Sequence, residues 1–64
     1  MMTVREVLKI LRADGWSLVR QTGSHRQFHH PTKPGTVTVA GKPGKTLHPK
    51  VWASIRKQAG LQGV

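Results

Sequence analysis

The stretch RQTGSHRQF, residues 20–28, predicts a β-hairpin, and the elements on either side of it follow from that hairpin. Thr22 and Gly23 have the composition of a two-residue turn, in which glycine permits the tight bend. Residues 16–21 before the turn and residues 24–30 after it have the composition of strands. We therefore expect two antiparallel strands joined directly by this turn.

The length of the turn decides which side chains share a face of the hairpin. With a two-residue turn at Thr22-Gly23, Arg20 lies opposite His25 and Val19 lies opposite Arg26. Phe28, the only phenylalanine, is expected to pack with Val19 against the helices, because successive residues of a strand face opposite sides. The side chains expected on the other, solvent-facing side are Leu18, Arg20, His25, Gln27 and His29.

A helix before the hairpin, a third strand and a second helix complete the expected order. Residues 3–6, TVRE, form a capping-box pattern that begins a helix, and Gly15 ends it. Residues 36–39, TVTV, alternate as a half-buried strand does, while Pro49 begins the second helix and Gly60 ends it. The apolar residues expected on the buried sides of the helices are Val4, Val7, Leu8, Leu11, Val51, Trp52, Ile55 and Ala59.

Each predicted helix has one apolar stripe, so both helices are expected to cover the same face of a three-stranded antiparallel sheet. The expected architecture is an α+β domain spanning residues 1–64, with the other face of the sheet open to solvent. The chain has no cysteine, which excludes disulfides and thiolate metal sites. Trp16 and Trp52 are expected to pack in the core, with stacking of an RNA base on Trp16 as the alternative.

Positive charge dominates the composition. Eleven lysines and arginines stand against two acidic residues, which gives a formal net charge of +9. Such a small basic body attracts polyanions, so nucleic acid is the favoured partner, and an acidic protein is compatible with the same charge. A membrane surface is disfavoured because the bases are spread along the chain. Neither a signal peptide nor a membrane span is indicated, so we expect a cytoplasmic protein.

His25 lies between two arginines on the expected open face, and this combination suits phosphate chemistry. Imidazole exchanges a proton near neutral pH, while Arg20 and Arg26 can clamp a phosphate through paired N–H groups. In RNA, removal of a 2′-hydroxyl proton lets that oxygen attack the adjacent phosphorus, and a donor to the leaving 5′-oxygen completes transesterification without a metal or cofactor. An exposed strand histidine is often inert, however, so the residues alone leave both interpretations open.

Three segments resemble the HicA toxins, small ribonucleases also labelled YcfA-like proteins: GSHRQF at 23–28, GWSLVRQ at 15–21 and SIRKQAGL at 54–61. The resemblance covers nearly the whole chain and implies a double-stranded-RNA-binding-like fold. It also implies mRNA cleavage, inhibition of translation, neutralisation by a HicB antitoxin that covers the active site, and a catalytic role for His25. Many relatives carry a proline and a further histidine after the third strand, where this chain has Ala40-Gly41.

Several other residues are candidates for RNA binding. Lys42, Lys45 and Lys50 gather near the start of the second helix, where backbone amides already favour anions. A solvated loop kept soluble by lysine is the alternative interpretation. Next to His25, Gly23 is a structural turn residue, and Ser24 is expected to orient the site through its hydroxyl.

The other histidines have different expected roles. His29 shares a face with His25 and is a candidate for RNA binding, but the pair lacks the further ligands of a zinc site, so no metal is expected. His30, beside Pro31, is expected to be structural and hydrogen-bonded at the end of its strand. His48 is expected to begin the second helix, with phosphate contact as the alternative.

Together these features predict a metal-independent endoribonuclease toxin that cleaves mRNA, with His25 as general acid or base. The alternative is a non-catalytic RNA-binding module, because a basic sheet and a lysine-rich loop fit both functions. A structural factor associated with the ribosome or another protein is a third hypothesis. Replacement of His25 by alanine separates the enzyme from the binding module.

Overall fold

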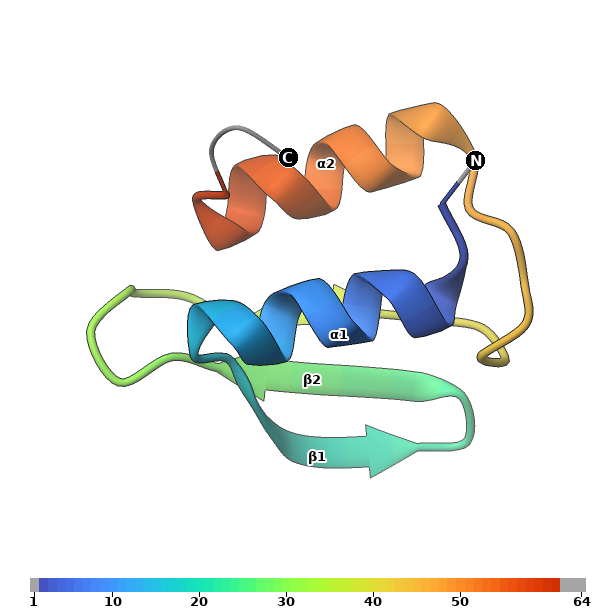
Figure 1. The fold of residues 1–64 in the computed structure, drawn as a ribbon. Helices are drawn as coiled ribbons and strands as arrows, with labels where there is room; N and C mark the ends of the chain where they lie inside the picture. The colour runs from blue at the N-terminus through green and yellow to red at the C-terminus, as the bar shows by residue number, and fades with distance from the viewer. Residues whose placement is uncertain (1, 62–64) are drawn as a thin grey trace.

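The computed structural model describes residues 2–61, which form two helices on one side of an antiparallel sheet (Figure 1). The strands lie in the order β1-β2-β3, so β2 is central and the other two strands are the edges. The predicted order, helix-strand-strand-strand-helix, is confirmed. The elements are α1 (Val4–Asp14), β1 (Ser17–Thr22), β2 (His25–His29), β3 (Val37–Val39) and α2 (Pro49–Ala59).

The helices begin and end where their sequence signals indicate. The Thr3 side chain accepts a hydrogen bond from the Glu6 amide (3.3 Å), and the Glu6 carboxylate accepts one from the Thr3 amide (3.0 Å), which confirms the capping box. The Thr3 amide, together with the Thr3 hydroxyl, lowers the pKa of the Glu6 carboxyl. Gly15 and Gly60 close the helices with φ of +106° and +62°, the left-handed region that favours glycine. Neither helix of the described chain is long and apolar enough to cross a membrane.

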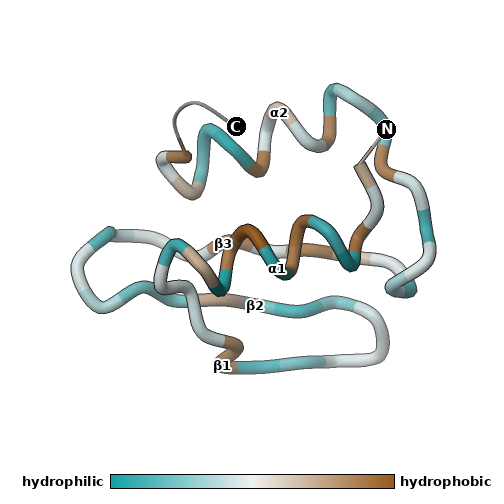
Figure 2. The backbone as a smooth tube through the Cα atoms, viewed as in Figure 1, coloured by the Kyte–Doolittle hydropathy of each residue, from teal (hydrophilic) through white to brown (hydrophobic). Residues whose placement is uncertain are grey.

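The hydrophobic core lies between the helices and one face of the sheet. Phe28, Val37 and Val39 form the sheet side of this core and are fully buried. Trp16 is only 2% exposed, which confirms its core position and leaves no ring face for base stacking. Figure 2 shows apolar residues gathered on α1 and β3, whereas the hairpin of β1 and β2 is largely hydrophilic. The remaining buried hydrophobic residues are Val4, Val7, Leu8, Leu11, Leu47, Ile55 and Ala59.

The hairpin turn consists of Gly23 and Ser24, one residue later than predicted, so the predicted register is wrong. Arg20 pairs with Gln27 and not with His25. Gly23 has φ of +57°, and among residues 2–61 no residue other than glycine has a positive φ. A positive φ at the first central position alone is the pattern of a type II′ turn, which requires glycine there.

A bulge in β1 changes which side chains face the core. The pairing shifts between Leu18 and Arg20, so Val19 has no cross-strand partner and is 51% exposed. The prediction that Val19 packs with Phe28 is therefore wrong. Val51 of α2, also predicted to be buried, is 46% exposed. All six residues of β1 are exposed, so this strand supplies pairing to the sheet and no side chain to the core.

A polar cluster joins the C-terminal ends of both helices to the loop after β2. The Lys33 ammonium donates hydrogen bonds to the Asp14 carboxylate (2.6 Å) and to the carbonyl oxygens of Ala59 (3.1 Å) and Gly60 (3.3 Å). The bond from Lys33 lowers the pKa of the Asp14 carboxyl. His30 donates from Nε2 to the Asp14 carbonyl oxygen at 2.7 Å, which confirms its structural role. The cluster fastens the end of the sheet that lies away from the hairpin turn.

Candidate active site on the open face of the sheet

His25 is the first residue of β2 and directly follows the hairpin turn. It lies three positions before buried Phe28, so its side chain points to the opposite face of the sheet, where it is exposed. Thr22 is its cross-strand partner. Within residues 2–61, no hydrogen bond or ion pair engages the His25 ring. The predicted facing of His25 is confirmed, and its ring is accessible to a substrate.

Arg20 shares this open face with His25 but is not directly opposite it. Arg20 pairs with Gln27, which lies two residues beyond His25 on the same strand. The two positions are therefore diagonal neighbours, about 7–8 Å apart at the backbone, a separation that long side chains span. A guanidinium and an imidazole in this arrangement can contact the same phosphate group.

Arg26 lies on the other face of β2 and braces the turn. Its Nη1 donates hydrogen bonds to the carbonyl oxygens of Ser24 (3.2 Å) and Gly41 (2.8 Å), and the Gly41 amide donates to the Ser24 carbonyl oxygen (3.3 Å). These bonds hold the backbone immediately before His25 against the segment that follows β3. The structure does not bring Arg26 together with Arg20, so its expected role as a second phosphate clamp stays a prediction.

The turn is also held from β1. The side-chain amide of Gln21 donates to the Gly23 carbonyl oxygen at 3.0 Å. A Cβ at Gly23 would meet no atom within 4 Å, so glycine is required there by its positive φ and not by lack of space. The Ser24 side chain makes no hydrogen bond to the described residues, and its orienting role stays a prediction.

His29 lies at the far end of the same strand. Its Nε2 lies 3.0 Å from the Thr36 hydroxyl. His25 and His29 are four residues apart, so about 13 Å separates them at a strand rise of about 3.3 Å per residue. They cannot act on one phosphate, and contact between His29 and RNA stays a prediction. In the part of the chain that the structure describes, no three possible metal ligands gather together.

The three lysines predicted to bind RNA are exposed and flank the start of α2. Lys45 donates from its amide to the Lys42 carbonyl oxygen (2.9 Å), which folds the loop into a turn. The Lys50 amide donates to Nδ1 of His48 (3.1 Å), so His48 is the N-cap of α2, as expected of a residue that begins a helix. Lys42 and Lys45 therefore project from a hydrogen-bonded loop, and Lys50 projects from the first turn of α2.

Neither acidic residue of the chain opposes this positive charge. Glu6 is bound to Thr3, and Asp14 is bound to Lys33 at the far end of the sheet. Cations that no acidic residue opposes create a positive potential that attracts polyanions. Within residues 2–61, Arg20 on the open face forms no ion pair, and neither do Lys42, Lys45 and Lys50 around the start of α2.

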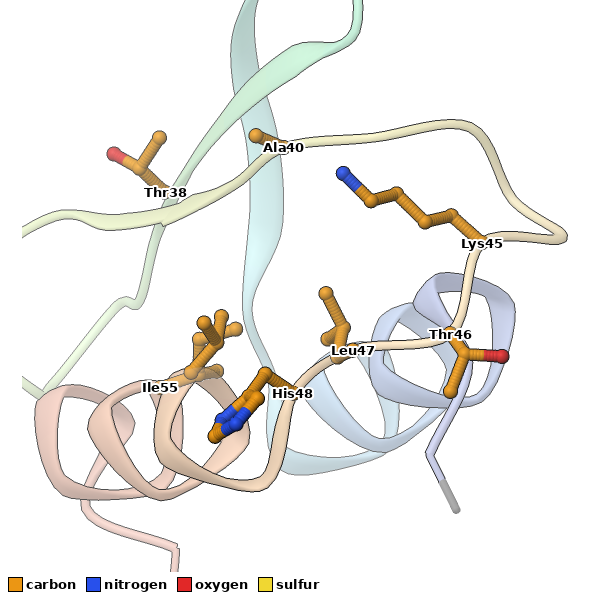
Figure 3. Close-up of a pocket in the computed structure, with 8 residues that line it drawn as sticks. Thr38, Ala40, Lys45, Thr46, Leu47, His48 and Ile55 are labelled. Carbon is orange, nitrogen blue, oxygen red and sulfur yellow. The ribbon is translucent and has the colours of Figure 1, made fainter.

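A hollow that the sequence did not predict lies between β3 and the start of α2 (Figure 3). Its volume is about 400 Å³. Figure 3 shows Leu47 and Ile55 pointing from the helix side toward β3, and the Lys45 side chain reaching toward Ala40. No local sequence pattern signals such a hollow, because it arises between elements that are distant in the chain.

A comparison with known protein families identifies the family of this chain. The family model described as HicA toxin of bacterial toxin-antitoxin matches residues 4–61. A search of curated proteins finds no match. The matched range includes both helices and the three strands, so the resemblance based on the Gly-Ser-His motif is confirmed. The chain therefore belongs to the family of HicA toxins of bacterial toxin-antitoxin systems.

Proposed function

We propose that this toxin is a metal-independent endoribonuclease that cleaves mRNA and thereby inhibits translation. The observation that carries the proposal is the exposed ring of His25, which stands on a braced backbone beside Arg20. Family membership supports a toxic activity, and the unopposed positive charge supports RNA as the target. The site therefore combines His25 as a proton carrier with Arg20 as a group that binds phosphate, and a substrate can reach both.

The reaction uses the nucleophile that RNA itself contains. The 2′-oxygen loses its proton and attacks the adjacent phosphorus, the bond from phosphorus to the 5′-oxygen breaks, and a 2′,3′-cyclic phosphate forms. His25 carries out one of the two proton transfers, either from the 2′-hydroxyl or to the leaving 5′-oxygen. Arg20 stabilises the negative charge that develops on the phosphoryl oxygens. DNA lacks the 2′-hydroxyl and is not cleaved.

The surrounding basic residues position the RNA on this site. Contacts to phosphates set the register of a nucleic acid without reading its sequence. Lys42, Lys45 and Lys50, beside the start of α2, bind the phosphates that flank the cleaved linkage. The other residues proposed to contact the RNA are Ser24, Arg26 and His29.

An antitoxin of the HicB kind is the proposed protein partner. It neutralises the toxin by covering the open face around His25, and acidic groups on the antitoxin would match the cations there. Both proteins act in the cytoplasm, where mRNA is translated. Covering His25 blocks substrate access without any change in the fold of the toxin.

The test compares His25→Ala with Gln27→Ala, a control on the same face of the same strand. We expect His25→Ala to reduce the rate of RNA cleavage by at least about 100-fold, the usual effect of losing an acid-base group. RNA binding, measured separately, should persist, and Gln27→Ala should cleave at the normal rate. A single 2′-deoxyribose at the cleaved linkage should block the reaction.

Two outcomes would contradict the proposal. An unchanged cleavage rate in His25→Ala would remove His25 from the mechanism. RNA binding by the natural protein without cleavage of any RNA, and without growth arrest on expression, would identify a non-catalytic RNA-binding module.

A further inference from the structure

The hollow lies where β3 ends at Val39 and the loop that follows is held against the start of α1. The following loop hydrogen-bonds to the start of α1: the Val4 amide donates to the Lys45 carbonyl oxygen (2.9 Å) and the Arg5 amide to the Pro43 carbonyl oxygen (2.9 Å). β3 is an edge strand, so its outer N–H and C=O groups have no strand partner within residues 2–61. A polar strand edge therefore borders the hollow.

The lining combines an apolar floor with a polar rim. Leu47 and Ile55, which are 7% and 4% exposed, form the floor (Figure 3). Val51, which is 46% exposed, also lines the hollow. Thr38 and His48 add polar groups, and no carboxylate lines the hollow. A volume of about 400 Å³ falls in the range of about 300–1,000 Å³ that is typical of small-molecule sites. A flat heterocycle with hydrogen-bonding edges, such as a nucleobase, matches this chemistry.

His48, which lines the hollow, has a defined tautomer. Its Nδ1 accepts the hydrogen bond from the Lys50 amide, so Nδ1 carries no proton. The neutral ring therefore carries its proton on Nε2. Because the ring also caps α2, its orientation is held by the helix backbone. His48 therefore contributes a polar side chain of fixed orientation to the lining of the hollow.

The hollow lies next to the site of the proposed chemistry. Arg26 pairs with Val39, so the same register places Ala40 beside His25. A backbone hydrogen bond of 3.3 Å between the residue after Ala40 and the residue before His25 supports this placement. Ala40 lines the hollow, and neighbouring strand positions are about 4.8 Å apart. An RNA strand that crosses His25 therefore meets the hollow within about one nucleotide.

We propose that this hollow binds the base of a nucleotide flanking the cleaved linkage and so sets the sequence preference of the toxin. The inference rests on the proposed ribonuclease function, because the RNA must run across His25. Lys45, on the rim, binds the phosphate of the same nucleotide. The substrate is single-stranded RNA, since only an unstacked base can enter the hollow.

The experiment measures binding to the inactive His25→Ala protein, so that cleavage does not interfere. Short single-stranded RNAs that contain the cleaved sequence carry one abasic nucleotide, placed at each position in turn, and fluorescence anisotropy gives each Kd. We expect one abasic position beside the cleaved linkage to weaken binding by about tenfold, as for loss of one recognised base. Abasic nucleotides further along the RNA should have much smaller effects.

Variants that fill the hollow identify where this base binds. Val51→Trp, added to the His25→Ala background, should abolish the extra sensitivity at that one position. Val19→Trp is the matched control, because Val19 is similarly exposed but lies on β1, away from the hollow. Val51→Phe fills the hollow with a smaller ring from the same position and serves if circular dichroism shows that Val51→Trp is unfolded.

The outcomes separate this inference from the proposed function. Sensitivity at one position that disappears in the filled variants and persists in Val19→Trp supports the base site. A flat profile across all abasic positions, or equal profiles in Val51→Trp and Val19→Trp, overturns it even if His25→Ala abolishes cleavage. Loss of antitoxin binding in Val51→Trp with RNA binding unchanged would also overturn it, because the hollow would then be a protein contact. Failure of the natural protein to cleave RNA would instead contradict the proposed function.

Discussion

One histidine, His25, begins β2 and another, His30, directly follows its last residue, and the two side chains have opposite environments. The Nε2 of His30 donates to the Asp14 carbonyl oxygen (2.7 Å), and its Nδ1 accepts from the amides of Thr32 (3.1 Å) and Lys33 (3.1 Å). In contrast, no hydrogen bond within residues 2–61 engages the ring of His25. A ring whose two nitrogen atoms both hold backbone groups stabilises the fold, whereas an unengaged exposed ring can exchange protons with a substrate.

The two ends of the strand also differ in what fixes the backbone. Around His30, a lysine, an aspartate and a tryptophan hold several elements together through side chains. Around His25, the braces are Arg26 and backbone groups, so the turn is ordered while the imidazole is left accessible. At the His25 site, Arg26 and main-chain groups hold the backbone in place, and the imidazole ring is left accessible for chemistry.

Removal of His30 should destabilise the protein, whereas removal of His25 should not. His30→Ala leaves three backbone groups without their partner and loses the edge contact with the Trp16 ring, whose centroid is 5.2 Å away. We expect a loss of about 2 kcal/mol in the free energy of unfolding, which lowers Tm by roughly 10 °C in a domain of this size. His25→Ala, measured in the same thermal denaturation, should change Tm by about 2 °C or less. Equal losses in the two variants would contradict the contrast.

Gly15→Ala should also destabilise the protein, because Gly15 lies against the His30 ring. Gly15 has φ of +106°, and a Cβ there would lie 2.8 Å from Nε2 of His30. Strained backbone and the displaced ring together should cost about 1.5 kcal/mol, measured by urea denaturation. Gly44→Ala is the control, because a Cβ there meets nothing within 4 Å and the φ of Gly44 is not positive. A neutral Gly15→Ala would show that the His30 ring moves away without cost.

Substitutions of the two arginines near His25 should distinguish a role in stability from a role in RNA cleavage. Arg26→Ala removes two hydrogen bonds to carbonyl oxygens and should cost about 1 kcal/mol of stability. Arg20→Ala removes no hydrogen bond within the described residues and should leave Tm unchanged, while RNA cleavage falls about tenfold through loss of charge stabilisation. Thermal denaturation measures the stability of each variant, and initial rates measure its RNA cleavage. A drop in Tm for Arg20→Ala alone would reverse the assignment.

The ion pair at the His30 end should give a small pH dependence of stability. Lys33 lowers the pKa of the Asp14 carboxyl in the folded protein. A carboxyl with a lowered folded pKa contributes stability that is fully present above its unfolded pKa, about 3.9, and is lost as the pH falls through the lower folded value. The difference in Tm between the natural protein and Asp14→Asn should therefore be constant near neutral pH and shrink in acid. Glu6 titrates in the same range but is common to both proteins, so it cancels.

The predictions that succeeded depend on local chemistry. The capping box at Thr3 and the glycines at the helix ends act within one turn of helix, so the sequence signals them directly. Phe28 alone indicated the buried face of β2, and that assignment placed His25 on the open face although the predicted pairing was wrong. Alternation along one strand does not depend on the partner strand.

The predictions that failed depend on contacts between distant residues. Both Thr22-Gly23 and Gly23-Ser24 are acceptable turns in composition, and a shift of one residue with a compensating bulge left Val19 exposed. The brace between Arg26 and Gly41 spans fifteen positions of the chain. A pattern of residue types cannot indicate which carbonyl oxygens an arginine reaches.

The order of helices and strands, the ends of the helices, the basic charge and the facing of His25 could be predicted from the amino-acid sequence, because each follows from spacing or composition within a few residues. The register of the hairpin, the brace behind His25, the engagement of His30 and the hollow between β3 and α2 required the folded chain. Each of these depends on the distance between groups far apart in the sequence, and that distance is set by how the helices and the sheet pack together.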